Sequence, residues 1–345
     1  MRIAFVTGLC PTGECGVGDY TRRLAHALRS LGVQAELVSD GSWGLRGAGK
    51  AIKSLEKLEP DIVHIQYPTA GFGYRLGPQM FAMRRKSVIT IHEASQSHIL
   101  RKLSLYPFMA RAQHLVFTSQ YERQFASKWA PWIARLSSVI PIGSNIKAMP
   151  GGGNRRGQEI AYFGLIMPGK GLEEILELAK LIQRAGCALS IRIIGKAHSK
   201  HESYFERLRL QSRGLPVIWE SDLNDEEVAT RLASCAIAYL PFPDGASERR
   251  ASLKAMLASG VGVVTTRGVH TPRDLEDIVK FSENVEDAYR IIRMLAEDTS
   301  ERERLGRKAV EYMRQFGWDR IAALHLEVYK RVVKTQGFRT SVCLS

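Results

Sequence analysis

The chain has 345 residues, of which 45% are hydrophobic and 24% are charged, and its formal net charge is +14. This length exceeds what one hydrophobic core usually serves, so we expect two domains and exclude a small disulfide-stapled protein. No apolar run reaches the roughly 20 residues of a membrane-spanning helix. The first residues, MRIAFVTGLC, also lack the pattern of a signal peptide. We therefore expect a cytoplasmic protein with reduced cysteines.

Strand and helix patterns alternate through residues 1–150. Residues 18–31 carry the pattern of an amphipathic helix. Short apolar runs typical of parallel strands lie at 2–8, 35–39, 61–68, 87–93, 114–119 and 137–143. The spacing leaves room for a helix or loop after each strand, which is the doubly wound α/β pattern. The glycine-rich stretch 148–158 is predicted to be a linker.

The pattern restarts after the linker and fills residues 151–330. Asn224 is the expected N-cap of one helix, and Gly260 is expected to end another. Strands are predicted at 159–164, 189–195, 216–220, 236–240 and 261–266, and helices at 171–186, 201–211, 224–235 and 252–259. The sequence therefore predicts an α/β protein of two Rossmann-like domains that face each other across a cleft.

Ligands of open parallel sheets bind beyond the carboxyl ends of the strands. After the first strand, Gly13, Gly16 and Gly18 would let the backbone approach a ligand at a helix start, although they also fit a tight turn. His92 ends the strand SVITIHE, where an imidazole can bond a sugar hydroxyl or steady a developing charge. His64, inside an earlier strand, is expected to be a core residue.

Two further segments in the second half have the chemistry of a phosphate site. Lys170 stands between two glycines before a helix and can reach phosphate oxygens. The loop before the helix at 252–259 concentrates groups that suit phosphate or diphosphate, because arginine forks and hydroxyls bind its oxygens. These are Asp244, Gly245, Ser247, Glu248, Arg249, Arg250 and Ser252. No cysteine–histidine pattern indicates a metal site.

The positive charge is concentrated in the first half. Residues 1–150 contain 19 Lys/Arg and 9 Asp/Glu, a balance of +10, which leaves +4 for the rest. Apolar residues are interleaved with this basic cluster. Its members are Arg84, Arg85, Lys86, Arg101, Lys102, Arg111, Arg123 and Lys128, among Phe81, Met83, Leu103, Tyr106, Phe108 and Trp129. Such a surface fits anionic lipid, a phosphorylated acceptor or nucleic acid, or is a set of solvated helix faces.

The order of these segments resembles the family-4 retaining glycosyltransferases of the GT-B fold. GVGDYTRRLAHAL looks like the first glycine loop and helix of the family, and DIVHIQYP and VITIHE look like its next strands. FGLIMPGKGLEE looks like its donor-phosphate loop, and DEEVATRLASCAIAYLPFPDG like the approach to its donor site. The resemblance implies an acceptor-binding domain at 1–150, a donor-binding domain at 151–330, and closing helices at 316–345 that cross back to the first domain.

This chain departs from the family at three positions. Leu165 stands where the family typically has an arginine, and Ala246 and Lys254 stand where it has two glutamates. The handling of the donor's sugar and ribose must therefore differ, and Asp244, Glu248 and Ser252 are nearby substitutes.

The resulting hypothesis is a retaining glycosyltransferase that moves a sugar from a nucleoside-diphosphate sugar to a glycan, a lipid-linked or polysaccharide precursor, or another small acceptor. Lys170 and Arg250 would offset the charge of the leaving diphosphate, and His92 would lie near the sugar. No cofactor and no metal are expected, and nucleic acid is not the expected partner. Peripheral contact with an anionic membrane is a further expectation. The alternatives are a sugar-nucleotide epimerase of the same fold and a non-catalytic module that binds an anionic polymer.

Overall fold

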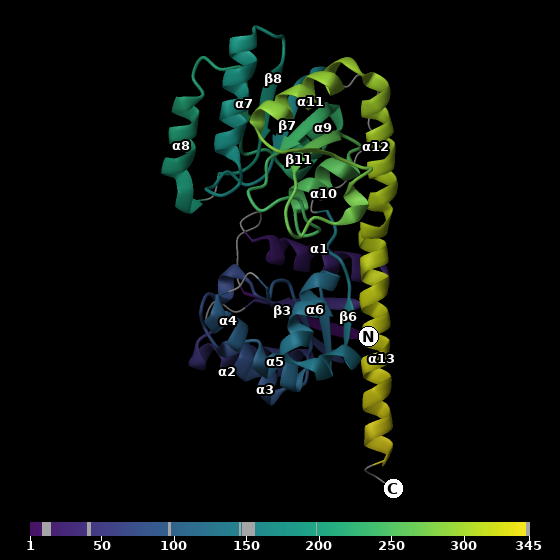
Figure 1. Ribbon diagram of the computed structural model, residues 1–345. Helices are drawn as coiled ribbons and strands as arrows, with labels where there is room; N and C mark the ends of the chain where they lie inside the picture. The colour runs from purple at the N-terminus through teal and green to yellow at the C-terminus, as the bar shows by residue number, and fades with distance from the viewer. Residues whose placement is uncertain are drawn as a thin grey trace. The chain divides into compact units, whose positions relative to one another are not determined.

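The protein is described by a computed structural model over residues 1–8, 15–39, 43–95, 98–144, 146, 156–197 and 199–342. It divides into two compact units (Figure 1). Unit 1 contains residues 1–143 and 316–345, and unit 2 contains residues 144–315. The chain thus changes unit a few residues before the predicted boundary at 150, and residues 316–330 belong to unit 1. The predicted linker, 148–158, lies mostly outside the described residues.

Unit 1 is built on a parallel sheet of six strands in the order β2-β1-β3-β4-β5-β6. The strands are β1 (Arg2–Val6), β2 (Gln34–Val38), β3 (Ile62–Tyr67), β4 (Val88–Ile91), β5 (His114–Phe117) and β6 (Ser137–Val139). The helices are α1 (Gly16–Ser30), α2 (Leu45–Leu58), α3 (Gly77–Arg84), α4 (Ile99–Leu103), α5 (Tyr106–Arg111), α6 (Gln120–Trp129) and α13 (Trp318–Val342). All six predicted strands of the first half are therefore present, five of them shorter than predicted and β2 shifted by one residue.

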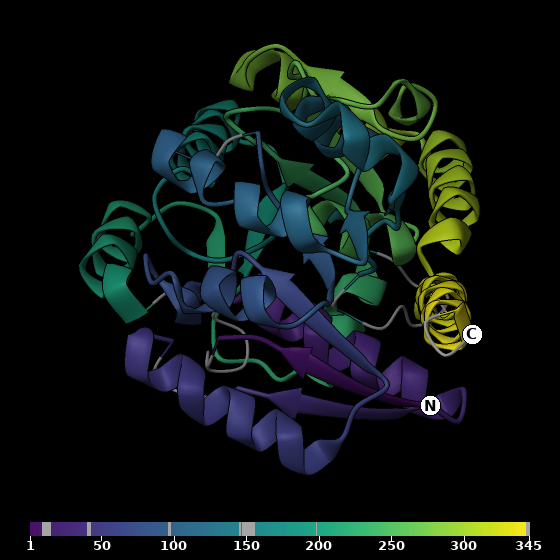
Figure 2. The same cartoon turned by 90° about the horizontal axis from the view of Figure 1, so that it is seen from below.

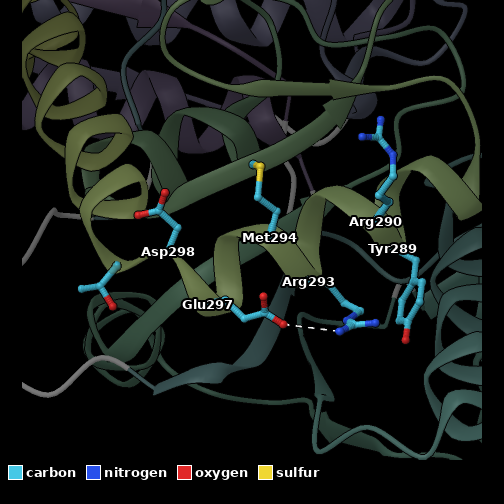
Figure 3. Close-up of a pocket in the computed structure, with 7 residues that line it drawn as sticks. Tyr289, Arg290, Arg293, Met294, Glu297 and Asp298 are labelled. Atoms are coloured by element: carbon cyan, nitrogen blue, oxygen red, sulfur yellow. Dashed lines mark hydrogen bonds and ion pairs between the residues drawn. The ribbon is translucent and has the colours of Figure 1, made fainter.

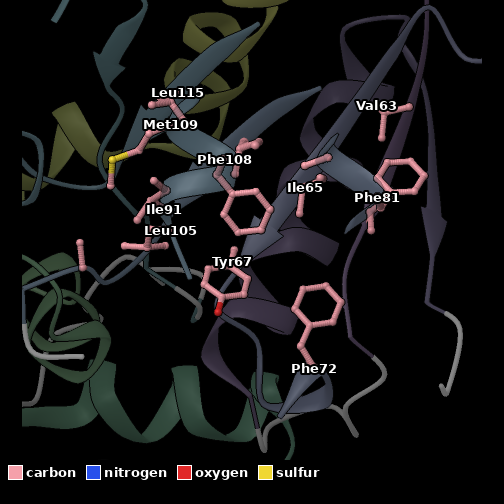
Figure 4. Packing of buried hydrophobic residues seen from close by; sticks show 14 of the residues in the cluster. Val63, Ile65, Tyr67, Phe72, Phe81, Ile91, Leu105, Phe108, Met109 and Leu115 are labelled. Carbon is pink, nitrogen blue, oxygen red and sulfur yellow. The ribbon is translucent and has the colours of Figure 1, made fainter. Parts of the chain in front are cut away.

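Alternation along the strands divides the core of unit 1 between the two faces of the sheet. On β1, Ile3 and Phe5 join one hydrophobic cluster, whereas Ala4 and Val6 join the other. Helices α1 and α13 supply the first cluster, and α2, α3, α5 and α6 cover the second. Figure 4 shows Phe81 and Phe108 inside this second cluster. Their expected place among the surface aromatic residues is therefore wrong, because both side chains are fully buried.

The C-terminal helix α13 is an integral layer of unit 1. It packs against α1 and is seen end-on in Figure 2. Two buried hydrogen bonds tie it to the rest of the unit, one from His64 Nδ1 to Tyr329 Oη (2.6 Å) and one between Tyr20 Oη and His325 Nε2 (2.9 Å). His64 is thus a core residue, as expected, with no exposed surface.

Unit 2 repeats the architecture with a second six-stranded parallel sheet in the order β12-β11-β10-β7-β8-β9. The strands are β7 (Arg156–Phe163), β8 (Ser190–Ile194), β9 (Val217–Glu220), β10 (Cys235–Leu240), β11 (Gly262–Thr266) and β12 (Lys280–Ser282). The helices are α7 (Leu172–Ala185), α8 (Glu202–Gln211), α9 (Asp225–Ser234), α10 (Ala251–Ala258), α11 (Val285–Glu297) and α12 (Thr299–Met313). The doubly wound α/β fold class is confirmed, and the cleft between the two domains stays a prediction.

Polar groups fix the ends and register of these elements. Asn224 caps α9 through a capping box, in which its side chain accepts from the Glu227 N–H and the Glu227 carboxylate accepts from the Asn224 N–H. The predicted cap is therefore confirmed. On β8, Arg192 pairs with Glu159 of β7 at 2.7 Å and with Glu220 of β9 at 2.5 Å. A slip of one residue in either pairing would turn one of these side chains to the other face of the sheet, so the triad locks the register.

Candidate functional site

Each sheet reverses its direction of winding at one point, and there the carboxyl ends of two neighbouring strands diverge. In unit 2 the reversal lies between β7 and β10, because the chain adds β8 and β9 on one side of β7 and then returns to the other side. In unit 1 it lies between β1 and β3. Ligands of open α/β sheets bind at such switch points.

The loops that follow β7 and β10 are in direct contact. A Cβ on Gly171 would lie 1.9 Å from the carbonyl oxygen of Pro241, and the φ of Gly171 is +78°. Only glycine fits this position, for both its space and its backbone. The hydroxyl of Tyr162, near the end of β7, donates to the carbonyl of Lys170 at 3.1 Å. The two loops thus form one surface at the switch point.

That surface brings Lys170 and Arg250 together. The pKa of Lys170 is lowered by burial and by the neighbouring Arg250, and the pKa of Arg250 is itself lowered by burial. Among the described residues, no carboxylate forms an ion pair with Lys170. Because Arg250 already has Asp244 as its partner, an anion bound here would chiefly relieve the desolvation and repulsion that lower the pKa of Lys170.

Arg250 is held in place by its own loop. Its guanidinium forms an ion pair with Asp244 and lies 4.6 Å from the ring centroid of Phe242. Arg250 is also the N-cap residue of α10 and makes no side-chain cap, and neither does Gly171 at the start of α7. Two helix N-termini without side-chain caps, each carrying partial positive charge, therefore begin at this switch point.

The remaining predicted residues of the loop have different roles in the packing. Gly245 has φ +83°, and a Cβ there would lie 2.2 Å from the Gly268 nitrogen, so the loop needs glycine for its own folding. Ser247 is buried and Ser252, in the first turn of α10, is half-exposed. Arg249 is half-exposed, and the Asp244 carboxylate forms an ion pair with Arg250. The site roles assigned to these residues from sequence stay predictions.

Lys254 and Glu248 form a second, deeper pair of charges. Lys254 is only 2% exposed, and burial lowers its pKa to about 7, against the opposing effect of Glu248. Burial also raises the pKa of Glu248, and the positive charge of Lys254 only partly offsets this rise. The fully buried Ala246 is held by hydrogen bonds between its N–H and Thr266 O and between its carbonyl and Thr271 Oγ1. The positions where the resemblance implies glutamates thus hold a buried methyl group and a buried amine.

In unit 1 the predicted residues gather near the carboxyl ends of the strands. Gly16 and Gly18 open α1, and Gly13 lies outside the described residues. Tyr20, in the next turn of α1, places its ring edge-on to His92, with centroids 4.9 Å apart. His92 follows β4, and its backbone N–H donates to the backbone carbonyl of Tyr67 at 2.8 Å. The structure therefore brings His92 and the start of α1 together.

A chain of buried hydrogen bonds defines the state of His92. Its Nε2 lies 2.8 Å from Gln66 Oε1, so Nε2 carries the proton and donates. Gln66 Nε2 lies 3.2 Å from His64 Nε2 and can donate to it, and Thr90 Oγ1 lies 2.7 Å from the same atom. Burial lowers the pKa of His92 to about 3, so the ring is neutral at pH 7 and its Nδ1 is the acceptor atom. His92 can thus accept from a hydroxyl but does not supply positive charge.

The sequence interpretation did not single out Tyr162, Tyr20 or Gln66. Tyr162 and Gln66 alternate with apolar residues inside strands, and Tyr20 lies in an amphipathic helix, so each has the pattern of a core position. Their positions near the ends of parallel strands or at a helix start were the available signal.

One pocket of unit 2 is lined by none of the residues predicted from sequence. A pocket of about 740 Å³ lies along α11 in unit 2, lined by Tyr289, Arg290, Arg293, Met294, Glu297, Asp298 and Thr299 (Figure 3). Its Arg293–Glu297 pair, at 3.4 Å, is exposed. Within the described ranges, no three His, Cys, Asp or Glu residues are placed to hold a metal. The three cysteines in those ranges, Cys15, Cys187 and Cys235, are free, as expected.

Comparisons with known proteins agree with this architecture. Residues 38–147 match the family described as Glycosyltransferase Family 4. A glycosyltransferase from Rickettsia africae is 16% identical, covering 96% of this chain and 98% of its own, with TM-score 0.74. Sucrose-phosphate synthase from Thermosynechococcus elongatus is 15% identical over 97% and 99%, with TM-score 0.71. Anabaena HepE, in complex with UDP and glucose, is 15% identical over 98% and 99%, with TM-score 0.69. No curated protein matches the chain.

The predicted GT-B fold is confirmed, because glycosyltransferase structures match nearly the whole chain. The resemblance to family-4 glycosyltransferases is confirmed over residues 38–147, which lie mainly in unit 1. None of the described helices is both long and apolar enough to cross a bilayer.

Proposed function

We propose that this protein is a glycosyltransferase that takes its sugar from a nucleoside-diphosphate donor and retains the anomeric configuration. The observation that carries the proposal is the pair of cations, Lys170 and Arg250, beside two helix starts at the switch point of unit 2. HepE, which shares the fold, has been solved with UDP and with UDP-glucose, and this supports a uridine-based donor.

The chemistry follows from the charge that develops on the donor. In the transfer, the bond between the anomeric carbon and the phosphate oxygen would break, the acceptor oxygen would bond to that carbon, and the proton of the acceptor hydroxyl would pass to the departing phosphate. The leaving nucleoside diphosphate gains negative charge, which Lys170, Arg250 and the helix N-termini would stabilise more in the transition state than in the ground state. The neutral His92 would accept a hydrogen bond from a sugar hydroxyl.

Donor turnover tests the proposal directly. The chain is incubated with uridine-, guanosine- and adenosine-diphosphate sugars, with and without glycan or lipid-linked acceptors, and nucleotide release and product anomers are followed by NMR. Turnover that rises with acceptor and gives a product of the donor's configuration supports a retaining transferase. Isomerisation without acceptor would indicate the epimerase, and no donor binding would indicate the non-catalytic module. Loss of turnover with EDTA would contradict the expected metal independence.

The first prediction concerns the two cations. Lys170→Met and Arg250→Met should each lower kcat/KM by about 30- to 1,000-fold, the range for losing one preorganised donor of roughly 2 to 4 kcal/mol. Arg209→Met on α8 is the matched control, because Arg209 also pairs with a carboxylate, that of Glu206, and lies 5.6 Å from an aromatic ring centroid, that of Phe205, but belongs to no predicted site. An equal loss in the Arg209 variant, or none in the Arg250 variant, would contradict the assignment.

A further inference from the structure

One surface of unit 1 combines large exposed apolar side chains with cations. We call it the apolar–basic face. It comprises the loop before α3, helix α4, the start of α5, the end of α6 and the short helix that follows α6. Its apolar members are Tyr74, Leu76, Ile99, Leu100, Leu103, Tyr106, Trp129 and Trp132, and its cations are Arg75, Arg101, Lys102, Lys128 and Arg135. Tyr74 is 92% exposed and Leu100 69%.

Contacts between side chains join these segments into one face. Arg101 lies 5.4 Å from the ring centroid of Tyr74, which links α4 to the loop before α3. Lys102 lies 5.0 Å from the ring centroid of Phe125, which links α4 to α6. A small cavity on this face is lined by residues of α4, α5 and α6, including Leu103, Tyr106 and Trp129.

Trp132 extends the same face beyond α6. Its ring centroid lies 6.0 Å from that of Tyr106, and its Nε1 donates to Met109 O at 3.2 Å. The indole N–H is therefore satisfied by the protein, while 45% of the residue stays exposed. Aromatic residues with one satisfied polar atom and an exposed apolar ring are enriched where proteins meet the headgroup layer of membranes.

The charge of the surrounding segment is strongly one-sided. Residues 62–144 contain ten Lys/Arg and only two Asp/Glu, namely Glu93 and Glu122. Glu122 is fully buried, and its carboxylate accepts from the N–H groups of Ala94 and Ser95 and from the Ser95 hydroxyl. Its charge is thus directed inward, away from the face. The charge complementary to this face is negative.

The aliphatic residues decide which anionic partner fits. Nucleic acid offers phosphates to cations and bases to aromatic rings, but it gives no apolar volume to Leu76, Ile99, Leu100 and Leu103. An anionic bilayer satisfies all three kinds of side chain. Aliphatic groups enter the acyl boundary, Trp and Tyr lie at headgroup level, and Lys and Arg extend their ammonium and guanidinium groups to lipid phosphates.

We propose that the apolar–basic face docks unit 1 onto an anionic phospholipid bilayer, with Ile99, Leu100 and Leu103 of α4 as the apolar contacts. The cations around α4 would be attracted to the negative surface within about a Debye length. The inference does not depend on the proposed transferase activity, because none of the site residues of either unit belongs to this face.

Vesicle binding by the full chain tests the proposal. Flotation is measured with vesicles that contain phosphatidylglycerol and with vesicles of phosphatidylcholine alone. We expect binding to the anionic vesicles that falls as salt is raised. Leu100→Ser/Leu103→Ser should weaken the partition coefficient about tenfold or more, and Arg101→Gln/Lys102→Gln by about 25-fold, since each cation near the surface contributes about fivefold. The matched control is Leu210→Ser/Arg213→Gln on exposed positions at the end of α8 in unit 2, which should bind like the parent.

Tryptophan quenching in the parent protein tests the same face without relying on the α4 variants, which could misfold. Brominated anionic lipid should quench tryptophan fluorescence, and most of this quenching should disappear in Trp129→Phe/Trp132→Phe. Circular dichroism checks the fold of each variant. The proposal is overturned if the parent does not float with anionic vesicles, if the α8 control loses as much binding as the α4 variants, or if quenching persists without Trp129 and Trp132. Duplex DNA that binds through the same residues, with no vesicle binding, would likewise overturn it in favour of a nucleic-acid surface.

Discussion

Lys254 lies almost completely buried on α10, with Glu248 as the carboxylate that opposes its desolvation. A buried amine is more costly to protonate than one in water, so its pKa falls from 10.5 to about 7. The unfolded chain therefore binds this proton more tightly than the folded chain does. The proton opposes folding most below pH 7, and this penalty declines as the pH rises from 7 toward 10.5.

The second prediction follows from this rise in stability with pH. Between pH 7 and pH 9, the free energy of unfolding of the parent should rise relative to that of Lys254→Met by about 2 kcal/mol, of the order set by 1.36 kcal/mol per pKa unit. Urea unfolding at the two pH values measures it. Lys180→Met, on the exposed surface of α7, is the control and should show no such change. A difference that stays constant with pH would mean that Lys254 keeps its ordinary pKa.

Residue chemistry was predicted from sequence where a side chain acts locally. Lys170 between two glycines and the arginines before α10 were visible in the sequence, because helix starts and glycine turns have local signals. That Arg250, rather than Arg249, packs on Phe242 and lowers the pKa of Lys170 depends on the pairing of β7 with β10. Local patterns do not encode that pairing. The burial of Lys254 has the same origin.

At the scale of elements, the capping box of α9 provides a simple test of local stability. In the third prediction, Asn224→Ala should lower the free energy of unfolding by about 1 kcal/mol, because it leaves the N–H groups of Glu226 and Glu227 without their acceptor. Chemical denaturation measures the change. In the parent, the backbone N–H of Asn224 donates to the Glu227 carboxylate at 2.8 Å. Glu227→Gln keeps an oxygen acceptor for this N–H, so it should lower the free energy of unfolding by less than half as much as Asn224→Ala. Equal losses in the two variants would mean that charge, not hydrogen bonding, stabilises this helix start.

Long periodic elements were predicted well, and short or irregular ones were not. All strands of the first sheet and most of the second were expected, because buried parallel strands read as apolar runs. β12 has only three residues, Lys280–Ser282, and its pattern does not differ from that of a loop. Gly245 was predicted only as a member of the phosphate loop, whereas the structure shows that the close approach of Gly268 requires glycine there. Such close backbone contacts are non-local.

At the scale of the whole molecule, the core of unit 1 contains buried histidines that should make its stability sensitive to acid. His64, His92 and His325 are all buried or half-buried neutral rings, and burial lowers the pKa of each, to about 3 for His92 and His325. Their folded pKa values lie below the ordinary 6.5, so the unfolded chain gains protons first. Stability is therefore full above pH 6.5 and declines as the pH falls toward 3.

The fourth prediction isolates one of these rings. His325→Gln keeps a partner for the Tyr20 hydroxyl but removes the titration. Between pH 6.5 and pH 5 it should lose about 2 kcal/mol less unfolding free energy than the parent. Urea unfolding at both pH values gives the slope of unfolding free energy against pH. His26→Gln, on the exposed side of α1, is the control and should keep the parental slope. If His325→Gln also keeps it, the acid sensitivity originates elsewhere.

Unit 1 is not continuous in the chain, since residues 144–315 intervene between its sheet and α13. His64 in β3 and Tyr329 in α13 are 265 positions apart and yet share a buried hydrogen bond. During synthesis, unit 2 therefore emerges from the ribosome complete before the segment that finishes unit 1. Until then, the sheet face with Phe5 and Val88 lacks one of its two covering helices. Unit 1 can therefore complete its core only after α13 has been synthesised, whereas the whole of unit 2 is available to fold earlier.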